Sequence, residues 1–321
     1  SAILKQISVL LAMETSDIIC CAITRDVKSG NQYKILATNF QSKSLSTIPA
    51  KVQTRIEEAL NQHSNIQGND DFVSYFTTRR GMENVLYVAK NEPLEPVQHH
   101  LLSFFAHNIA VSHENLKLRE VIRDSQRELS YIIGEAVELR SKETGSHVRR
   151  VAHISALLAR HYGLPDNEAE MIKLASPLHD VGKVAIPDLI LNKPGPHTNE
   201  ERQIMQTHAK AGFDMLRKSD NPILQLGATI AHEHHECWDG SGYPNGLVKN
   251  AISAAGRIVA VADVFDALGS KRCYKGSWSE TQIREYFTAQ RGKKFDPRLV
   301  DLLLANFTTF AAIRCQFPDP Q

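Results

Sequence analysis

The sequence predicts a multidomain fold: a small α/β domain, then a long linking helix, then an all-α domain. Three observations carry this prediction. Strand-type runs occur only in residues 1–97, apolar residues then recur at alternating spacings of three and four, and the remaining sequence shows helical patterns alone. We expect a regulatory or dimerisation domain at 1–115, a helical stalk at 116–142 and a second domain at 143–321.

The first domain is expected to combine strands with one helix. Runs rich in β-branched, aromatic and other apolar residues are separated by turn residues. They predict strands at 17–25, 32–39, 72–78 and 85–90 and a helix at 48–63. No metal, phosphate or nucleophile motif occurs in this part, so we expect it to be regulatory.

A regular apolar stripe follows this domain. It fits a heptad repeat that one serine interrupts, and its members are Leu118, Ile122, Ser125, Leu129, Ile132, Ala136 and Leu139. We call these residues the heptad stripe. Such a stripe is typical of a coiled coil, and it predicts a parallel homodimer through the stalk. The alternative is a helix that packs only on its own domain.

Composition excludes several classes of function. The formal net charge is +1, whereas a dedicated nucleic-acid or membrane-surface binder is usually strongly basic, so no DNA partner is expected. No apolar run approaches the roughly 20 residues that a membrane span needs. The five cysteines form no C-x-x-C pair, which favours a reducing cytoplasm. The chain starts at Ser1 without a methionine, so we expect a fragment of a longer protein.

Histidines and carboxylates cluster in the second domain. The candidate metal ligands are Glu143, His147, His179, Asp180, His208, His234, His235 and Asp263. Glu143 and His147 share a helix face by their spacing, and a carboxylate such as Asp180 can bridge two metals. Asp263 lies in an apolar helix, where a charge is costly unless it is paired or ligated. Each residue alone has an ordinary structural explanation, but together they indicate two or three divalent ions, which suit phosphodiester hydrolysis.

Three motifs then resemble the HD-GYP family, a subgroup of the HD-domain metallohydrolases. They are ETGSH at 143–147, HDVGK at 179–183 and HHECWDGSGYP at 234–244. Shorter matches lie at 186–188, 193–195, 257–258, 263–268 and 295–297. The resemblance covers about residues 120–305, and its longest motif is highly specific.

The resemblance implies an all-helical domain that hydrolyses cyclic di-GMP, a bacterial second messenger, to pGpG and often on to GMP. It implies one metal bound by His147, His179, Asp180 and Asp263, and another bound by Asp180, His208, His234 and His235. Glu143 matches the position that supplies an extra ligand in members with three metals. The implied metal is usually iron, with manganese also active.

Asp180 and Lys183 are the candidate catalytic residues. Lys183 lies four residues after His179, so a helix would place both on one face and let the ammonium reach a substrate phosphate. The alternative for Lys183 is simple solvent exposure.

Three further residues are candidates for substrate binding. Tyr243 offers a hydroxyl to a phosphate or to the backbone of its own glycine-containing loop. Arg272 and Lys275 resemble positions that contact substrate phosphate or guanine in family members.

The segment 269–275 (GSKRCYK) departs from the family's Thr-Ser-Asp-Arg-Pro-Tyr type of run. Because this segment lies near the substrate pocket, three functions remain open. The first is a cyclic di-GMP phosphodiesterase, the second a non-catalytic cyclic-dinucleotide receptor, and the third a phosphodiesterase for another nucleotide, such as a mixed cyclic dinucleotide.

Residues 101–118 look like the closing helix of GAF-like sensory domains. GAF-like domains found before HD-GYP domains often follow a phosphorylation-receiver domain. We therefore expect such a receiver upstream of Ser1 in the full protein.

Overall fold

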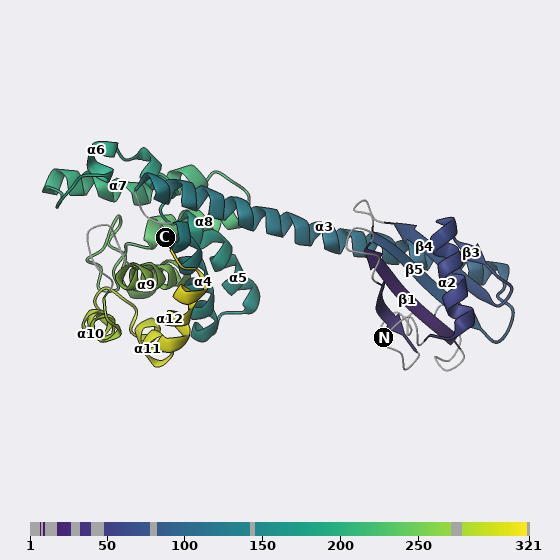
Figure 1. Cartoon of the computed structure of the whole chain (residues 1–321). Coiled ribbons are helices and arrows are strands. Elements are labelled where there is room, and N and C mark those ends of the chain that lie inside the picture. Colours follow the sequence, from purple (N-terminus) through teal and green to yellow (C-terminus); the bar gives the residue numbers. More distant parts are fainter. Residues whose placement is uncertain are drawn as a thin grey trace. The chain divides into compact units, whose positions relative to one another are not determined.

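The computed structural model describes residues 7, 9, 18–26, 33–39, 48–77, 82–141, 145–270 and 278–319. The chain divides into two compact units, Ser1–Ile122 and Arg123–Gln321. A small sheet-containing part is followed by a mostly helical part, as the sequence predicts (Figure 1). The finer boundaries at 1–115, 116–142 and 143–321 stay a prediction.

The first unit is built on a five-stranded antiparallel sheet with the order β2-β1-β5-β4-β3. The strands are β1 (Ile18–Asp26), β2 (Tyr33–Thr38), β3 (Ile66–Gln67), β4 (Asp71–Thr77) and β5 (Met82–Lys90). The four expected strands are present, and the two-residue β3 is an addition. Helix α2 (Ala50–Gln62) is the helix expected at 48–63.

Both faces of this sheet are covered, which explains the apolar run along its central strand. On one face, Val85 and Tyr87 of β5 pack in one core with buried residues of α2. On the other face, Leu86 of β5 packs with Leu102 of the following helix. Cys20 and Cys21 are free, buried thiols on opposite faces of the sheet and behave as small apolar residues.

Helix α3 (Pro96–Arg140) extends over 45 residues and includes residues 116–140 of the segment predicted as a stalk. Its residues up to Ile122 belong to the first unit and the rest to the second. In the second unit one face of α3 is buried: the Ser130 hydroxyl donates to the carbonyl of Leu174 at 2.6 Å. A Cβ on Gly134 would stand 2.4 Å from the carbonyl oxygen of Pro177, so only glycine allows this approach. No helix within the described ranges is both long and apolar enough to cross a bilayer.

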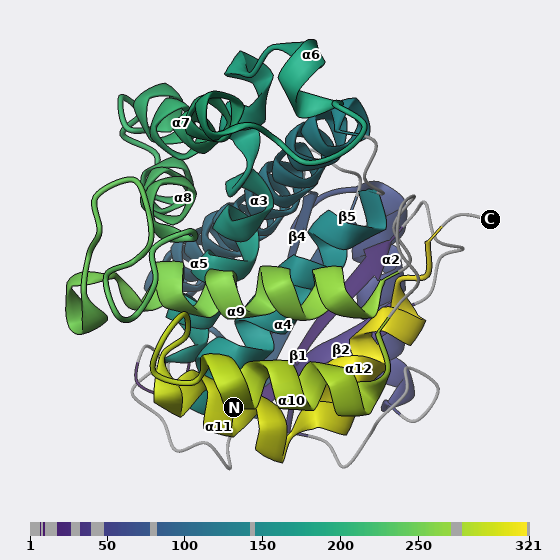
Figure 2. The ribbon, with the colours of Figure 1, turned by 90° about the vertical axis from the view of Figure 1, so that its left-hand side faces the viewer.

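The second unit is helical (Figure 2). Besides the end of α3, its described α-helices are α4 (Gly145–Tyr162), α5 (Asp166–Ala175), α6 (Asp188–Leu191), α7 (Asn199–Leu216), α8 (Pro222–Glu233), α9 (Ala254–Gly269), α10 (Glu280–Gln290), α11 (Pro297–Ala305) and α12 (Phe307–Gln316). Three short 3-10 turns complete it: η2 (Ser176–Leu178), η3 (Val181–Ala185) and η4 (Lys249–Ala251). Among residues 145–270 and 278–319 only isolated β-bridges occur, so the expectation of an all-α domain is confirmed there.

Helix α9 forms the interior of this unit. Ile258, Val261 and Phe265 are fully buried, and α9 packs beside α4 and α8. Ser253 caps its start by accepting the N–H of Gly256 at 3.0 Å. An aspartate carried by such a helix lies in the domain interior, so its charge requires partners.

Candidate metal centre

The centre begins at a tight turn that follows α5. His179 ends η2, and Asp180 precedes η3 with φ −103° and ψ 11°. Two 3-10 turns therefore replace the single helical face that the sequence suggested for His179 and Lys183. The turn nevertheless brings the Lys183 ammonium to 2.8 Å from Oδ2 of Asp180.

Glycine at position 182 lets this turn lie directly against α7. A Cβ on Gly182 would stand 1.9 Å from the carbonyl oxygen of His208 and 2.5 Å from the nitrogen of Gly212. Real Cβ atoms essentially never come that close to backbone, so larger residues are excluded. This contact places Asp180 beside His208, its first imidazole partner.

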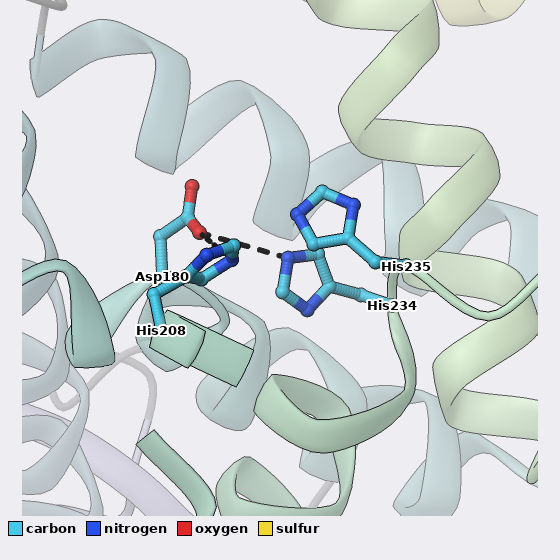
Figure 3. Close-up of side chains that lie close together, drawn as sticks. All are labelled: Asp180, His208, His234 and His235. Atoms are coloured by element: carbon cyan, nitrogen blue, oxygen red, sulfur yellow. Dashed lines mark ion pairs between the residues drawn. The ribbon is translucent and has the colours of Figure 1, made fainter. Parts of the chain in front are cut away.

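One donor group, which we call cluster B, joins Asp180, His208, His234 and His235. Oδ1 of Asp180 lies 3.2 Å from Nε2 of His208 and 3.6 Å from Nε2 of His234, and the four side chains face a common space (Figure 3). His208 comes from α7, whereas His234 terminates α8 and His235 follows it. One ligand atom from each residue lies within 4.8 Å of the others, which is close enough for a shared ion.

Another donor group, which we call cluster A, joins His147, His179 and Asp263. Nε2 of His147 on α4 lies 3.3 Å from Oδ1 of Asp263 on α9. One turn further along α9, the fully buried Asp266 accepts Nδ1 of His147 at 2.8 Å and the Arg150 guanidinium at 2.8 Å. Asp266 thereby fixes the orientation of the His147 ring, as carboxylates behind metal-binding histidines commonly do.

Three further imidazoles are oriented by the backbone. Nδ1 of His179, His208 and His234 lies within hydrogen-bond distance of the carbonyl oxygens of Ser176 (2.8 Å), Met205 (2.6 Å) and Ile230 (3.1 Å). Each Nδ1 therefore carries the proton and donates it. When the ring is neutral, its Nε2 has its lone pair toward the centre, which is the form a metal ion requires.

These inward atoms show that the site fits divalent ions. Nε2 of His179, His208 and His234 and Oδ1 of Asp180 are buried, and none has a hydrogen-bond partner among the described residues. Buried polar atoms without partners are rare because each costs free energy. A set of imidazole nitrogens and carboxylate oxygens suits a borderline divalent cation such as iron, manganese or zinc.

Burial and the neighbouring charges shift the pKa values of the side chains in the centre. Burial raises the pKa of Asp180, but Lys183 and His179 outweigh it and hold that pKa well below its usual range. Burial lowers the pKa of His179, but Asp180 and Asp263 raise it to about 9. Burial, reinforced by the neighbouring His234, lowers the pKa of His235 well below its usual range, so His235 is neutral.

The loop of the third motif places Tyr243 over cluster B. The Tyr243 ring stacks on His235 with ring centres 4.8 Å apart. Burial and the charges of Asp180 and Asp263 raise the pKa of Tyr243, so its hydroxyl keeps its proton and can donate. The buried Glu236 shapes the loop by accepting the N–H groups of Asn245 and Leu247 at 2.8 and 2.9 Å.

Glycine is required at two positions of this loop, for two different physical reasons. Gly240 has φ +85°, a conformation that favours glycine. Gly242 is needed for space, because a Cβ there would stand 2.3 Å from the nitrogen of Cys237.

The sequence reasoning missed Glu138, which lies on α3. Its side chain is 1% exposed, and it forms a third donor group with His179 and Asp180. Its position in the sequence could have indicated this, because Glu138 lies four residues after Gly134 and therefore on the same face of the helix. That face is the buried side of α3, away from the heptad stripe. The candidate ligand Glu143 and the candidate substrate contacts Arg272 and Lys275 lie outside the described residues.

Comparison with known proteins gives two family matches. A model described as an HD domain matches residues 132–299. A domain of unknown function, DUF3369, matches residues 1–122. The second match leaves the GAF-like resemblance a prediction.

Three relatives are similar in sequence. A 3′3′-cGAMP-specific phosphodiesterase 2 of Vibrio cholerae is 43% identical over 325 residues, covering 99% of this chain and 62% of that protein. The cyclic di-GMP phosphodiesterase response regulator RpfG of Xanthomonas campestris is 45% identical, covering 61% of this chain and 52% of that protein. A cyclic di-GMP phosphodiesterase of Thermotoga maritima is 45% identical, covering 55% and 48%. The chain therefore spans about half to three fifths of the length of these relatives.

We expect Asp180→Ala to abolish binding of divalent metal, because cluster B loses its carboxylate and cluster A loses the neighbouring oxygen that lies 3.3 Å from Nε2 of His179. Metal per chain, measured by plasma mass spectrometry after desalting, is the readout. Asp214→Ala on α7, which removes an exposed ion pair with Lys210, is the matched control and should leave metal content unchanged. Full metal content in Asp180→Ala would contradict the assignment.

Metal uptake should release protons. In the metal-free protein the pKa of His179 is about 9, so its Nε2 is protonated at neutral pH and must lose that proton to bind an ion. Affinity for manganese should therefore rise by up to about tenfold per pH unit between about pH 7 and pH 9 and then level off. Titration calorimetry in buffers of different ionisation enthalpy counts the released protons. An affinity that is flat over this range would show that His179 is not a ligand.

Proposed function

We propose, from the premise that this chain belongs to the HD-domain family and to its HD-GYP group, that it is a metal-dependent phosphodiesterase acting on a cyclic dinucleotide. One observation carries the proposal. Oδ1 of Asp180 faces His208 and His234, whereas Oδ2 lies 3.3 Å from Nε2 of His179. A carboxylate whose two oxygens face two donor groups suits a pair of metal ions, the arrangement used to cleave phosphodiesters.

The residues divide into holders of metal and binders of substrate. We assign His147, His179 and Asp263 of cluster A, together with Asp180, to one ion, and Asp180, His208, His234 and His235 of cluster B to the other. Bound divalent cations, with iron or manganese as our first choices, supply Lewis acidity and an activated water for attack on phosphorus. Glu143 is our candidate for an additional ligand if a third ion binds.

Lys183 and Tyr243 supply donors beside these groups. The Lys183 ammonium, 2.8 Å from Asp180, can donate to a non-bridging phosphate oxygen or to the leaving oxygen when the ester bond breaks. The protonated hydroxyl of Tyr243 can hold a second phosphate oxygen. Arg272 and Lys275 are our candidates for further substrate contacts.

Cyclic di-GMP is the first substrate we propose, with pGpG as product and GMP after a second cleavage. A second candidate is 3′3′-cGAMP. The relative named for that nucleotide matches 99% of this chain, whereas the cyclic di-GMP phosphodiesterases of Xanthomonas and Thermotoga match 61% and 55%. The departure from the family pattern at 269–275 also favours testing both nucleotides.

A non-catalytic receptor is disfavoured by the completeness of the donor groups. Seven of the eight candidate ligands are described, and every one of them points a competent nitrogen or oxygen into a donor group. A receptor that had lost catalysis would be under no constraint to keep all of them.

The test is anaerobic incubation of the iron(II)- or manganese(II)-loaded protein with each cyclic dinucleotide, with products separated by chromatography. We expect a linear dinucleotide from the wild type and from Asp214→Ala, and none from Asp180→Ala. A fully metallated protein that binds both nucleotides but cuts neither would favour the receptor.

We also infer a homodimer formed through the heptad stripe of α3. Within the second unit its apolar members Leu129, Ile132 and Leu139 are 58%, 52% and 69% exposed, although the opposite face of the same helix is buried. The spacing of three and four repeats along this exposed face, which is the spacing at which a second copy of the helix packs.

Ser125→Leu should strengthen this dimer, because it fills the polar interruption of an otherwise apolar heptad position. Sedimentation equilibrium should show a dissociation constant lower by about tenfold, equivalent to about one buried side chain. Glu128→Leu is the control, since position 128 is exposed but off the stripe. Equal dissociation constants for wild type and Ser125→Leu would argue against the stripe as interface.

A further inference from the structure

The last turns of α3 hold the loop that carries Lys183. The Arg140 guanidinium donates to the carbonyl oxygens of Lys183 and Ile186, each at 2.6 Å. Arg140 also pairs with Asp188 at 2.9 Å. The backbone of η3 is thus fixed to the end of α3.

The side chain of Lys183 is held by the same turn of α3. Its ammonium lies 3.4 Å from each carboxylate oxygen of Glu138 and 2.8 Å from Oδ2 of Asp180. The Glu138 carboxylate accepts the hydroxyl of Ser141 at 3.2 Å, which fixes its orientation. Lys183 therefore sits between two carboxylates, one from the donor groups and one from α3.

Among the described residues, Glu138 provides the carboxylate that can keep this position for Lys183 when the centre is loaded. If Asp180 held cations through both of its oxygens, those cations would repel the ammonium over a few ångströms, because like charges repel. Glu138 is 1% exposed, so its charge is little screened by solvent and requires a cationic partner.

Glu138 is poorly suited to be a metal ligand itself. Its donor group consists of His179 and Asp180, and the single inward nitrogen of His179 already belongs to cluster A. Among the described residues, that leaves the carboxylates of Glu138 and Asp180 for a third ion, with the Lys183 ammonium between them. An ammonium at that place repels a cation.

We propose that Glu138 is a positioning residue, which holds the Lys183 ammonium beside the loaded metal centre for contact with the scissile phosphate. The contact of Lys183 with the phosphate rests on the proposed function, whereas the pairing of Glu138 with Lys183 rests on the geometry alone. It makes the end of α3 part of the active site, because a displacement of this helix would move Lys183.

The first experiment compares Glu138→Gln with Glu135→Gln in the metal-loaded full chain. Glu135 lies three residues earlier on α3 and pairs with Arg149 outside the site. We expect Glu138→Gln to lower kcat by about 10- to 100-fold, the effect of losing one charged hydrogen bond, with a smaller change in KM. Glu135→Gln should match the wild type, and Glu138→Asp, which keeps the charge, should fall between. Metal per chain should equal that of the wild type in all three, whereas loss of an ion in Glu138→Gln would overturn the proposal and make Glu138 a ligand.

A double-mutant cycle identifies Lys183 as the residue through which Glu138 acts. In a Lys183→Met background, Glu138→Gln should lower kcat by less than about threefold, because the partner is already gone. Effects that multiply would overturn the proposal.

A second readout needs no substrate. Acetylation of Lys183 by a water-soluble anhydride, followed by peptide mass spectrometry, should be faster in metal-loaded Glu138→Gln than in wild type and Glu135→Gln. An unchanged rate would overturn the pairing. If the wild type cuts neither cyclic dinucleotide, the proposed function fails, and this labelling rate still decides whether Glu138 holds Lys183.

Discussion

The carboxylate of Asp180 is the interaction on which the centre of the second unit depends. It is a charge in a largely buried place, and desolvation alone would make it unstable there. It is held ionised by a ring of partners, with Lys183 and His179 on the side of Oδ2 and His208 and His234 on the side of Oδ1. The helices around it can be understood as supports that bring these partners within reach of one carboxylate.

Those supports act through backbone and through a second layer of charges. Gly182 lets η3 touch α7, which sets the distance from Asp180 to His208. Backbone carbonyls orient three imidazoles through Nδ1, and Asp266 orients that of His147. Asp266 in turn is stabilised by Arg150, whose guanidinium is itself almost fully buried. Because each ring is fixed before an ion arrives, little reorganisation is required on binding.

Sequence reasoning could locate the donors because metal ligands are few in kind and the motifs pair them. The structure places His147, His179 and Asp263 in one donor group and Asp180, His208, His234 and His235 in another, and their role as metal ligands stays a prediction. Sequence reasoning could not predict the path of the backbone between them. The step from His179 to Lys183 runs through two 3-10 turns rather than one helix, because Asp180 leaves the helical region of φ and ψ. The contact of Gly182 with α7 joins residues 26 positions apart in sequence, which no local periodicity reports.

Glu138 shows a different limit of prediction from the sequence. In a helix whose apolar residues repeat at heptad spacing, a glutamate away from the stripe is usually exposed to solvent. Here α3 has two apolar sides within the second unit: an exposed one with Leu129, Ile132 and Leu139, and a buried one with Gly134 and Val137. Glu138 belongs to the buried side, and its charge is compensated by Lys183 from another element. A face buried by residues distant in sequence cannot be distinguished from a solvated one by periodicity alone. The same helix thus has an exposed apolar side, which is the proposed dimer interface, and a buried side whose Glu138 and Arg140 contact Lys183 and the backbone of η3.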